Sequence, residues 1–280
     1  MVWRIGLLAL TACGRIGFDP AGGSTPDARL GPWSAPELVG ELSSPDLDDD
    51  PTLTDDMLEI FFNRAAPDFE IWTATRTSVD VPFGAPRVVT ELGSPSEEST
   101  PEISGDGLTM YLSSTRGGAD DDIYFATRAT RSAAWSTPVV VSELSSPVGD
   151  EGAVVDRAGT TVYFDSDRDG TDVIYTATRA GPASPWSSPV ARADVDGVGE
   201  EESAFLEANG LVMWLNVKTG TAFDLHIRTR ATPDGMFGPA TVFELNTADN
   251  DADAWVSPDG RVLYFASDRD GDSEIYRATR

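Results

Sequence analysis

The chain has 280 residues, of which 40% are hydrophobic, so it can bury a sizeable core in one large β domain or two ordinary ones. Asp and Glu number 47 against 20 Lys and Arg, which gives a formal net charge of -27. Because nucleic-acid binding needs a basic face, this balance argues against nucleic acid as a partner and favours cations or basic proteins.

The N-terminus has the pattern of an export signal. Arg4 precedes an apolar run from Ile5 to Leu10, which is too short to cross a bilayer that needs about 20 residues. The run ends in LTAC, which resembles the lipobox of bacterial lipoproteins, where the cysteine is lipid-modified after cleavage. Cys13 is the only cysteine of the chain and has no internal disulfide partner. We therefore predict a signal peptide at 1–12 and lipidation of Cys13.

Residues 13–30 are rich in Gly, Pro, Ser and Asp and show little apolar pattern. Such a composition favours a flexible tether, here between a lipid anchor and a folded domain at 31–280. The anchor would be the only contact of the chain with a membrane. Gly14, in place of Asp after the cysteine, implies by the same resemblance the outer membrane or cell surface of a Gram-negative bacterium.

One unit recurs five times in the folded domain, at a spacing of 50 to 52 residues. Each copy ends in a strand-like hexapeptide, preceded by a Gly- and Asp-rich hairpin link and an apolar strand that closes on a basic residue. The hexapeptides are IWTATR (71–76), IYFATR (123–128), IYTATR (174–179), LHIRTR (225–230) and IYRATR (275–280).

A fourth element follows each of the first four copies and stands once more before the first copy, at 32–42. Four antiparallel strands with this period and no helical periodicity are typical of a β-propeller blade. The chain ends on the strand 275–280, which would be an open sheet edge unless another strand covers it. We therefore predict an all-β, five-bladed propeller of four-stranded blades, closed by residues 32–42 in the last blade.

The fifth copy, SPDGRVLYFASDRDGDSEIYRATR (257–280), resembles the PD40 or WD40-like repeat of TolB-type propellers. The resemblance covers residues 32–280 and is weakest in the fourth copy. It implies a propeller fold and an exported protein with an interaction role, and it implies no single activity. We expect a monomer.

Acidic residues precede or open the first strand of every copy, which lines the central channel of a propeller. We expect them to converge on one mouth, where they would attract Ca²⁺ or a basic peptide. The alternative is that they only solvate loops and cap turns as part of the repeat. The candidates are Asp49, Asp50, Glu97, Glu98, Asp150, Glu151, Glu201, Glu202, Asp251 and Asp253.

The hairpin link of the third copy matches the first half of an EF-hand loop, with Asp165, Asp167 and Asp169 at positions one, three and five and glycine at six. Thr176 takes the twelfth position, where such loops have a bidentate Glu. The alternative is a turn held by Asp side chains.

Two further features repeat in every copy. A basic residue at the end of the second strand, such as Arg64, should pair across the hairpin with an acid at the start of the third, such as Glu70. An aromatic residue opens each fourth element and should pack the blade. The aromatic residues are Trp33, Phe83, Trp135, Trp186 and Phe237.

Catalysis has little support in the sequence. The single histidine, His226, takes the place of Tyr276 in its repeat, and no metal-protease or phosphate-loop motif occurs. We therefore predict a binding or scaffolding module at the cell envelope for a protein, a peptide or a glycan. The alternative is a carbohydrate-active hydrolase, because five-bladed propellers include glycosidases; Glu98, Glu151 and Glu202 would then be its carboxylates.

Overall fold

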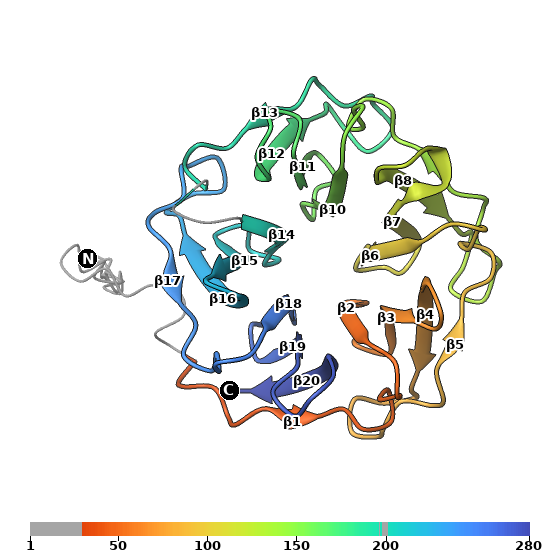
Figure 1. Cartoon of the computed structure of the whole chain (residues 1–280), viewed down its shortest axis with the longest axis vertical. Coiled ribbons are helices and arrows are strands. Elements are labelled where there is room, and N and C mark those ends of the chain that lie inside the picture. Colours follow the sequence, from red (N-terminus) through yellow and green to blue (C-terminus); the bar gives the residue numbers. More distant parts are fainter. Residues whose placement is uncertain (1–29, 196, 198–200) are drawn as a thin grey trace, which may run out of the picture.

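The structure, a computed structural model, describes residues 30–195, 197 and 201–280 and forms five antiparallel sheets of four strands. The sheets stand as blades in a ring around a common centre (Figure 1). The predicted five-bladed β-propeller is therefore confirmed. Within the described ranges the only helical element is η2, a 3-10 turn at Thr115–Gly117, and no helix is long and apolar enough to cross a membrane. The expected signal peptide, Cys13 and all of the tether but Leu30 lie outside the described residues.

The strands run outward from the channel in chain order in the first four blades. Blade one holds β2 (Asp48–Leu53), β3 (Glu59–Ala65), β4 (Phe69–Thr75) and β5 (Arg87–Val88), and blade two holds β6 (Glu98–Ile103), β7 (Thr109–Ser114), β8 (Asp122–Thr127) and β9 (Val139–Val140). Blade three holds β10 (Asp150–Val155), β11 (Thr161–Ser166), β12 (Val173–Thr178) and β13 (Val190–Ala191). Blade four holds β14 (Glu201–Leu206), β15 (Val212–Thr219), β16 (Ala222–Thr229) and β17 (Thr241–Val242).

The fifth blade joins the two ends of the domain. It holds β18 (Asp251–Val256), β19 (Val262–Ser267) and β20 (Glu274–Thr279), and β1 (Glu37–Leu38) is its outer strand (Figure 1). In the ladder Glu37 lies opposite Arg277 and Leu38 opposite Tyr276. The predicted closure by the early segment is confirmed, although only two of its residues form a strand.

Every innermost strand carries a β-bulge. The pairing register with the second strand shifts at the third residue in all five blades, and that residue has a positive φ between 43° and 62°. Its amide faces the preceding blade: Thr100 N donates to Asn63 Oδ1 at 3.1 Å, for example. The bulge residues are Asp50, Thr100, Gly152, Ser203 and Asp253.

The hydrophobic core is divided into five clusters, each between two neighbouring blades. Phe61 of blade one, for example, packs with Leu112 and Trp135 of blade two, and the other clusters follow the same scheme around the ring. The ring buries both faces of each sheet, which is why the middle strands read as nearly continuous apolar runs.

The repeated arginine at the end of the second strand has a different partner from the predicted one. Arg64 bonds Asp48 of the innermost strand, with Nε to Oδ1 at 2.6 Å, and does not pair with Glu70. Its Nη2 also donates to the Leu42 carbonyl, which follows β1, and so ties blade one to the closing segment. Arg116, Arg168 and Arg269 repeat this arrangement with Glu98, Asp150 and Asp251.

The aromatic residue of each fourth element is buried, as predicted. A guanidinium from the end of the third strand covers each ring and also donates to a carbonyl in the turn between the first and second strands. These cation-π contacts place the guanidinium carbon 3.9 to 4.5 Å from the ring centroid. The rings, exposed by 5 to 8%, are Trp33, Phe83, Trp135, Trp186 and Phe237.

Candidate functional site: the acidic mouth of the channel

The central channel contains three consecutive cavities. The middle one, which we call the waist, measures about 50 Å³ and is lined by the five bulge residues. On one side it shares Asp50 and Asp253 with a cavity of about 540 Å³, the acidic mouth. On the other side it shares Glu102 and Phe205 with a cavity of about 450 Å³, the opposite mouth. Both mouths have the volume of a typical ligand pocket.

The acidic mouth has a strongly one-sided charge. Nine of the described residues that line this cavity are Asp or Glu, and no described lining residue is Lys or Arg. Six of the acids are among the sequence candidates: Asp49, Asp50, Glu97, Glu151, Glu202 and Asp253. The sequence reasoning missed Asp121, Asp268 and Asp272, which lie in or beside the hairpin links between second and third strands. Those links were interpreted as turns only, although their Asp content repeats.

The other four candidates belong to the framework. Their carboxyl groups are buried in ion pairs at the end of the innermost strand, and none of the four lines a cavity of the channel. In blade four Lys218 replaces the repeated arginine, and Arg228 from β16 pairs with the acid instead, with Nη2 to Oε1 of Glu201 at 3.1 Å. The four residues are Glu98, Asp150, Glu201 and Asp251, exposed by 0 to 3%.

Two carboxyl groups in the acidic mouth titrate close to neutral pH. Burial raises the pKa of Asp49 to about 8, and the charges of Asp253 and Asp48 add to the effect. Burial also raises the pKa of Glu151 to about 7, with further contributions from neighbouring acids that include Asp121 and Glu202. A cation entering this mouth would favour the ionised forms, so its binding would release protons.

Asp50 and Asp253 form a carboxyl pair at the base of the acidic mouth. Their side chains share a hydrogen bond, and the Asp253 carboxyl also accepts from the Asp50 amide. Asn216 Nδ2 donates to Asp253 Oδ1 at 2.6 Å. Burial, followed by the charges of Asp253 and Asp49, raises the pKa of Asp50 well above its ordinary value. Burial thus favours the protonated form of this pair, and the repulsion between the two carboxyl groups adds to the effect on Asp50.

The three carboxylates of the hydrolase alternative do not come together. Glu151 and Glu202 line the acidic mouth, whereas Glu98 is fully buried. Its carboxylate accepts from the Ser94 amide at 2.8 Å and pairs with Arg116 at 2.9 Å. Asp50 and Asp253 cannot replace this set, because glycosidase carboxyl groups lie about 5 to 9.5 Å apart and these two are hydrogen-bonded.

The three acids of the EF-hand-like stretch do not form one site either. Asp165 accepts from the Ser203 amide at 3.2 Å, in the interface between blades three and four. Asp169 accepts from the Tyr175 hydroxyl, and Asp167 supplies the carbonyl that closes the turn to Gly170 at 2.7 Å. No group of three or more His, Cys, Asp or Glu side chains in the described part of the chain has a geometry that could hold a metal ion.

Comparison with known proteins adds evidence on the fold. No protein-family model matches the chain, and the comparison with curated proteins likewise gives no match. Among solved structures, TolB from Acinetobacter baumannii aligns with a TM-score of 0.55 at 19% identity, over 86% of this chain and 56% of that one. This chain thus spans little more than half the length of that TolB.

Glycoside hydrolases align with similar scores. The α-L-arabinofuranosidase PaAbf62A from Podospora anserina has a TM-score of 0.59 at 12% identity, over 83% of this chain and 90% of that one. The family 117 glycoside hydrolase Zg3597 from Zobellia galactanivorans has a TM-score of 0.58 at 14% identity, over 84% of both chains. At these identities the likeness establishes the fold alone: the chain is a five-bladed β-propeller, with TolB and glycoside hydrolases among its structural neighbours.

Proposed function

We propose that this protein is a lipoprotein of the cell envelope whose propeller binds a basic segment of a partner protein at the acidic mouth. The observation that carries the proposal is the lining of that cavity: its described lining residues include nine acids and neither Lys nor Arg. Such a field raises the local concentration of a cationic partner and speeds its association.

The carboxyl groups that would contact the partner are Glu97, Glu151 and Glu202. All three line the acidic mouth, and Glu97 is exposed. The raised pKa of Glu151, which follows from burial and from nearby acids, gives the site unfavourable self-repulsion at pH 8. A Lys or Arg side chain would relieve that repulsion, whereas an anionic or neutral partner would not.

The binding test uses a fluorescent peptide with several Lys and Arg residues and a second peptide in which Glu replaces them. With the full chain we expect the basic peptide to bind, the acidic peptide not to bind, and the affinity to fall steeply with salt. Because the pKa of Glu151 is about 7, affinity should also rise between pH 6 and pH 8.

Matched variants localise the contact. The double variant Glu151→Gln, Glu202→Gln should weaken peptide binding by at least about 10-fold, which corresponds to about 1.4 kcal/mol. Glu143→Gln removes an exposed acid that lies outside the cavity and should leave the affinity unchanged. Equal losses in both variants would mean that only the general acidity of the surface attracts the peptide, and the proposed site would be wrong.

The envelope part of the proposal depends on the N-terminal pattern that ends in Cys13. Expressed in a Gram-negative host, the chain should partition with membranes and carry a lipid. Cys13→Ser should carry no lipid and should keep its signal peptide, so it should have a larger mass than the mature form of the unmodified chain. A serine variant that still matures to the same size and sediments with membranes contradicts lipidation, without bearing on the acidic mouth.

A carbohydrate-active hydrolase is the second candidate, favoured by the glycoside hydrolases among the structural neighbours. Glu151 and Glu202 are the two carboxyl groups of the earlier set that share a cavity. If they are an acid and a base or nucleophile, release of arabinose from an arabinose-substituted glycan should disappear in either single Gln variant. If the unmodified chain releases no sugar, the hydrolase proposal would be contradicted and the binding proposal would remain.

A further inference from the structure

One position of the innermost strand differs in every blade. The first residue of this strand is an acid in all five blades, and the third residue forms the bulge in all five. The fifth residue, by contrast, is polar, acidic, aliphatic or aromatic depending on the blade. Three of these five side chains are buried between blades, whereas Glu102 and Phe205 are only partly buried and are therefore available to a ligand. The fifth residues are Thr52, Glu102, Val154, Phe205 and Trp255.

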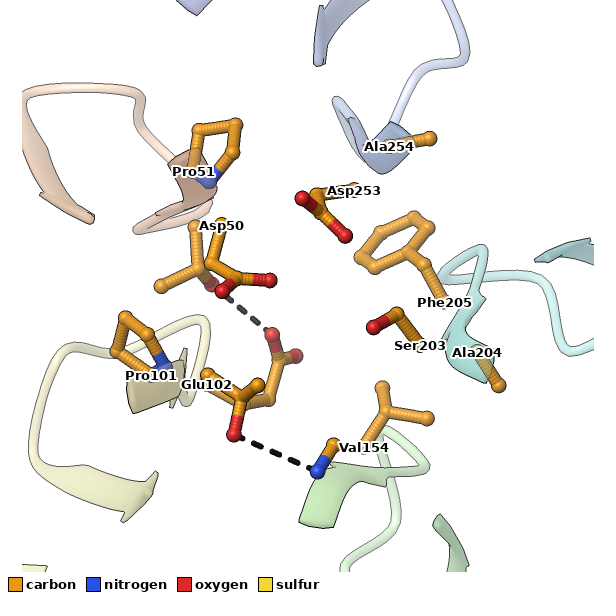
Figure 2. Close-up of a pocket in the computed structure, with 13 residues that line it drawn as sticks. Asp50, Pro51, Pro101, Glu102, Val154, Ser203, Ala204, Phe205, Asp253 and Ala254 are labelled. Atoms are coloured by element: carbon orange, nitrogen blue, oxygen red, sulfur yellow. Dashed lines mark hydrogen bonds between the residues drawn. The ribbon is translucent and has the colours of Figure 1, made fainter. Parts of the chain in front are cut away.

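These side chains meet where the waist opens into the opposite mouth. Figure 2 shows Glu102 and Phe205 pointing into the same space from different blades. Thr52 Oγ1 donates to Glu102 Oε2 at 3.0 Å and orients the carboxyl, and no described residue donates a hydrogen bond to Oε1. The rings of Phe205 and Trp255 lie with their centroids 6.4 Å apart, and Trp255 also lines the opposite mouth.

The rim of the opposite mouth does not repel a cation. Its two arginines are already engaged: Arg157 pairs with Asp55, and Arg179 lies 3.9 Å from the Trp186 ring centroid and donates to the Gly159 carbonyl at 2.6 Å. The acids on the rim outnumber them. These are Asp55, Asp106 and Asp156.

We propose that the opposite mouth binds a small organic ammonium ion, with the charged nitrogen between the Glu102 carboxyl and the Phe205 ring and the apolar body toward Trp255. A carboxyl and aromatic rings are the groups that recognise ammonium ions in water-poor sites. The cavity of about 450 Å³ suits a small molecule. This site is separate from the acidic mouth and does not depend on the function proposed for it.

The carboxyl that receives the cation titrates above neutral pH. Burial raises the pKa of Glu102 to about 8, against a small opposing effect of the Thr52 hydroxyl. The other titratable or charged groups around it are Asp50 and Asp253 in the waist, Tyr111 on β7, and the charged rim residues described above. Because the ionised form of Glu102 binds the cation, affinity should rise with pH until Glu102 is fully ionised.

The test compares choline chloride with 3,3-dimethyl-1-butanol, a neutral molecule of the same shape, by calorimetric titration of the full chain at pH 6 and pH 9. We expect choline to bind at least about 10-fold more tightly at pH 9 than at pH 6, since one pKa unit corresponds to a factor of 10. The neutral analogue should bind more weakly at pH 9 and show no such pH dependence. Equal affinity for the two compounds, or no choline binding, would overturn the proposal.

Two variants separate the site from a general effect of charge. Glu102→Gln keeps an oxygen that accepts from Thr52 and should abolish the rise in choline affinity with pH. Phe205→Leu keeps an apolar side chain without the ring face and should weaken choline binding by roughly 3- to 10-fold. Glu151→Gln changes the acidic mouth and should leave choline binding intact; a loss there would assign the cation to the other mouth.

A last arm distinguishes a small molecule from a protein side chain. A Lys-rich peptide should not displace choline, because the cavity is sized for a small ligand. If the peptide displaces choline competitively, and this displacement is lost in Glu102→Gln, the assignment to a small ion would be wrong. The site would then bind a lysine side chain of a partner protein.

Discussion

The closing segment should contribute as much stability as the corresponding segment inside the ring, and Trp33 provides the test. Its ring is 8% exposed and makes edge contacts with Trp214 and Phe243, each with centroids 6.4 Å apart. The guanidinium of Arg280, in the last residue of the chain, lies 4.1 Å from its centroid. Trp33 thus connects the beginning of the domain with blade four and with the C-terminus.

Replacing Trp33 by Ala should lower the free energy of unfolding by about 3–5 kcal/mol for the buried ring. Loss of the contact with Arg280 adds about 0.5–1 kcal/mol. For a domain of this size, each kcal/mol corresponds to roughly 2–4 °C in melting temperature. Trp33→Ala should therefore melt roughly 7 to 24 °C below the unmodified chain by circular dichroism, and urea denaturation should show the corresponding loss of free energy.

Trp186→Ala is the matched control in blade three. This ring is 7% exposed, and Arg179 covers it at 3.9 Å, but its blade is built from consecutive strands. If the early segment closes the ring, both variants should lose similar stability. A Trp33→Ala chain that melts with the unmodified protein, while Trp186→Ala loses several kcal/mol, would refute closure by this segment.

Three further predictions follow from the framework and the channel. Arg228→Ala removes the guanidinium that pairs with the buried Glu201 carboxylate and should cost about 3–5 kcal/mol in urea denaturation; a loss under about 1 kcal/mol would refute a buried ion pair between these two residues. Burial raises the pKa of Asp50 well above its ordinary value, so the folded chain binds a proton at this carboxyl more tightly than the unfolded chain does. The free energy of unfolding should therefore fall as pH rises from about 4 to 8, and Asp50→Asn should flatten part of that fall. A free energy of unfolding that rises over this range would contradict the raised pKa. Since the described residues offer no cluster of three metal ligands, millimolar Ca²⁺ should leave the melting temperature unchanged, and an increase of several degrees would contradict this expectation.

The architecture was predictable because it depends on features that repeat. Five copies of a three-strand unit and one displaced fourth element determine the blade number, and the need to cover strand 275–280 determines the closure. The length of the fourth strands was not predictable. Beside its aromatic residue each fourth element is held to the third strand by a single backbone hydrogen bond, such as Gly84 N to the Thr75 carbonyl at 2.8 Å, and by an arginine over the ring, and only two residues form a regular strand.

The partner of the repeated arginine could not be chosen from sequence alone. In the pairing register, Arg64 lies between Asp48 on one side and Glu70 on the other, so either acid is within reach. Burial decides: Asp48 is fully buried, where an unpaired carboxylate is costly, while Glu70 is half-buried and can be hydrated. Since burial depends on the neighbouring blade, the pattern of a single pair of strands does not predict which of the two acids is buried.

The same dependence on the neighbouring blade explains why two of the acidic candidates, Asp50 and Asp253, have a structural role at the bulges. The bulge amide of each innermost strand needs an acceptor from the blade before it, and four of the five junctions supply one from the second strand. At the fifth junction that position is Ala266, which has no acceptor, and the Asp253 carboxyl accepts from the Asp50 amide instead.

Asp50 and Asp253 are therefore accounted for by the junction where the ring closes. Burial, followed by the charge of the neighbouring acid, accounts for the raised pKa of Asp50, and no ligand is needed to explain it. Glu97, Glu151 and Glu202, the carboxyl groups proposed to contact the partner, line the acidic mouth from blades two, three and four. A basic partner should consequently contact one side of the ring, and substitutions at Asp50 should change stability more than peptide affinity.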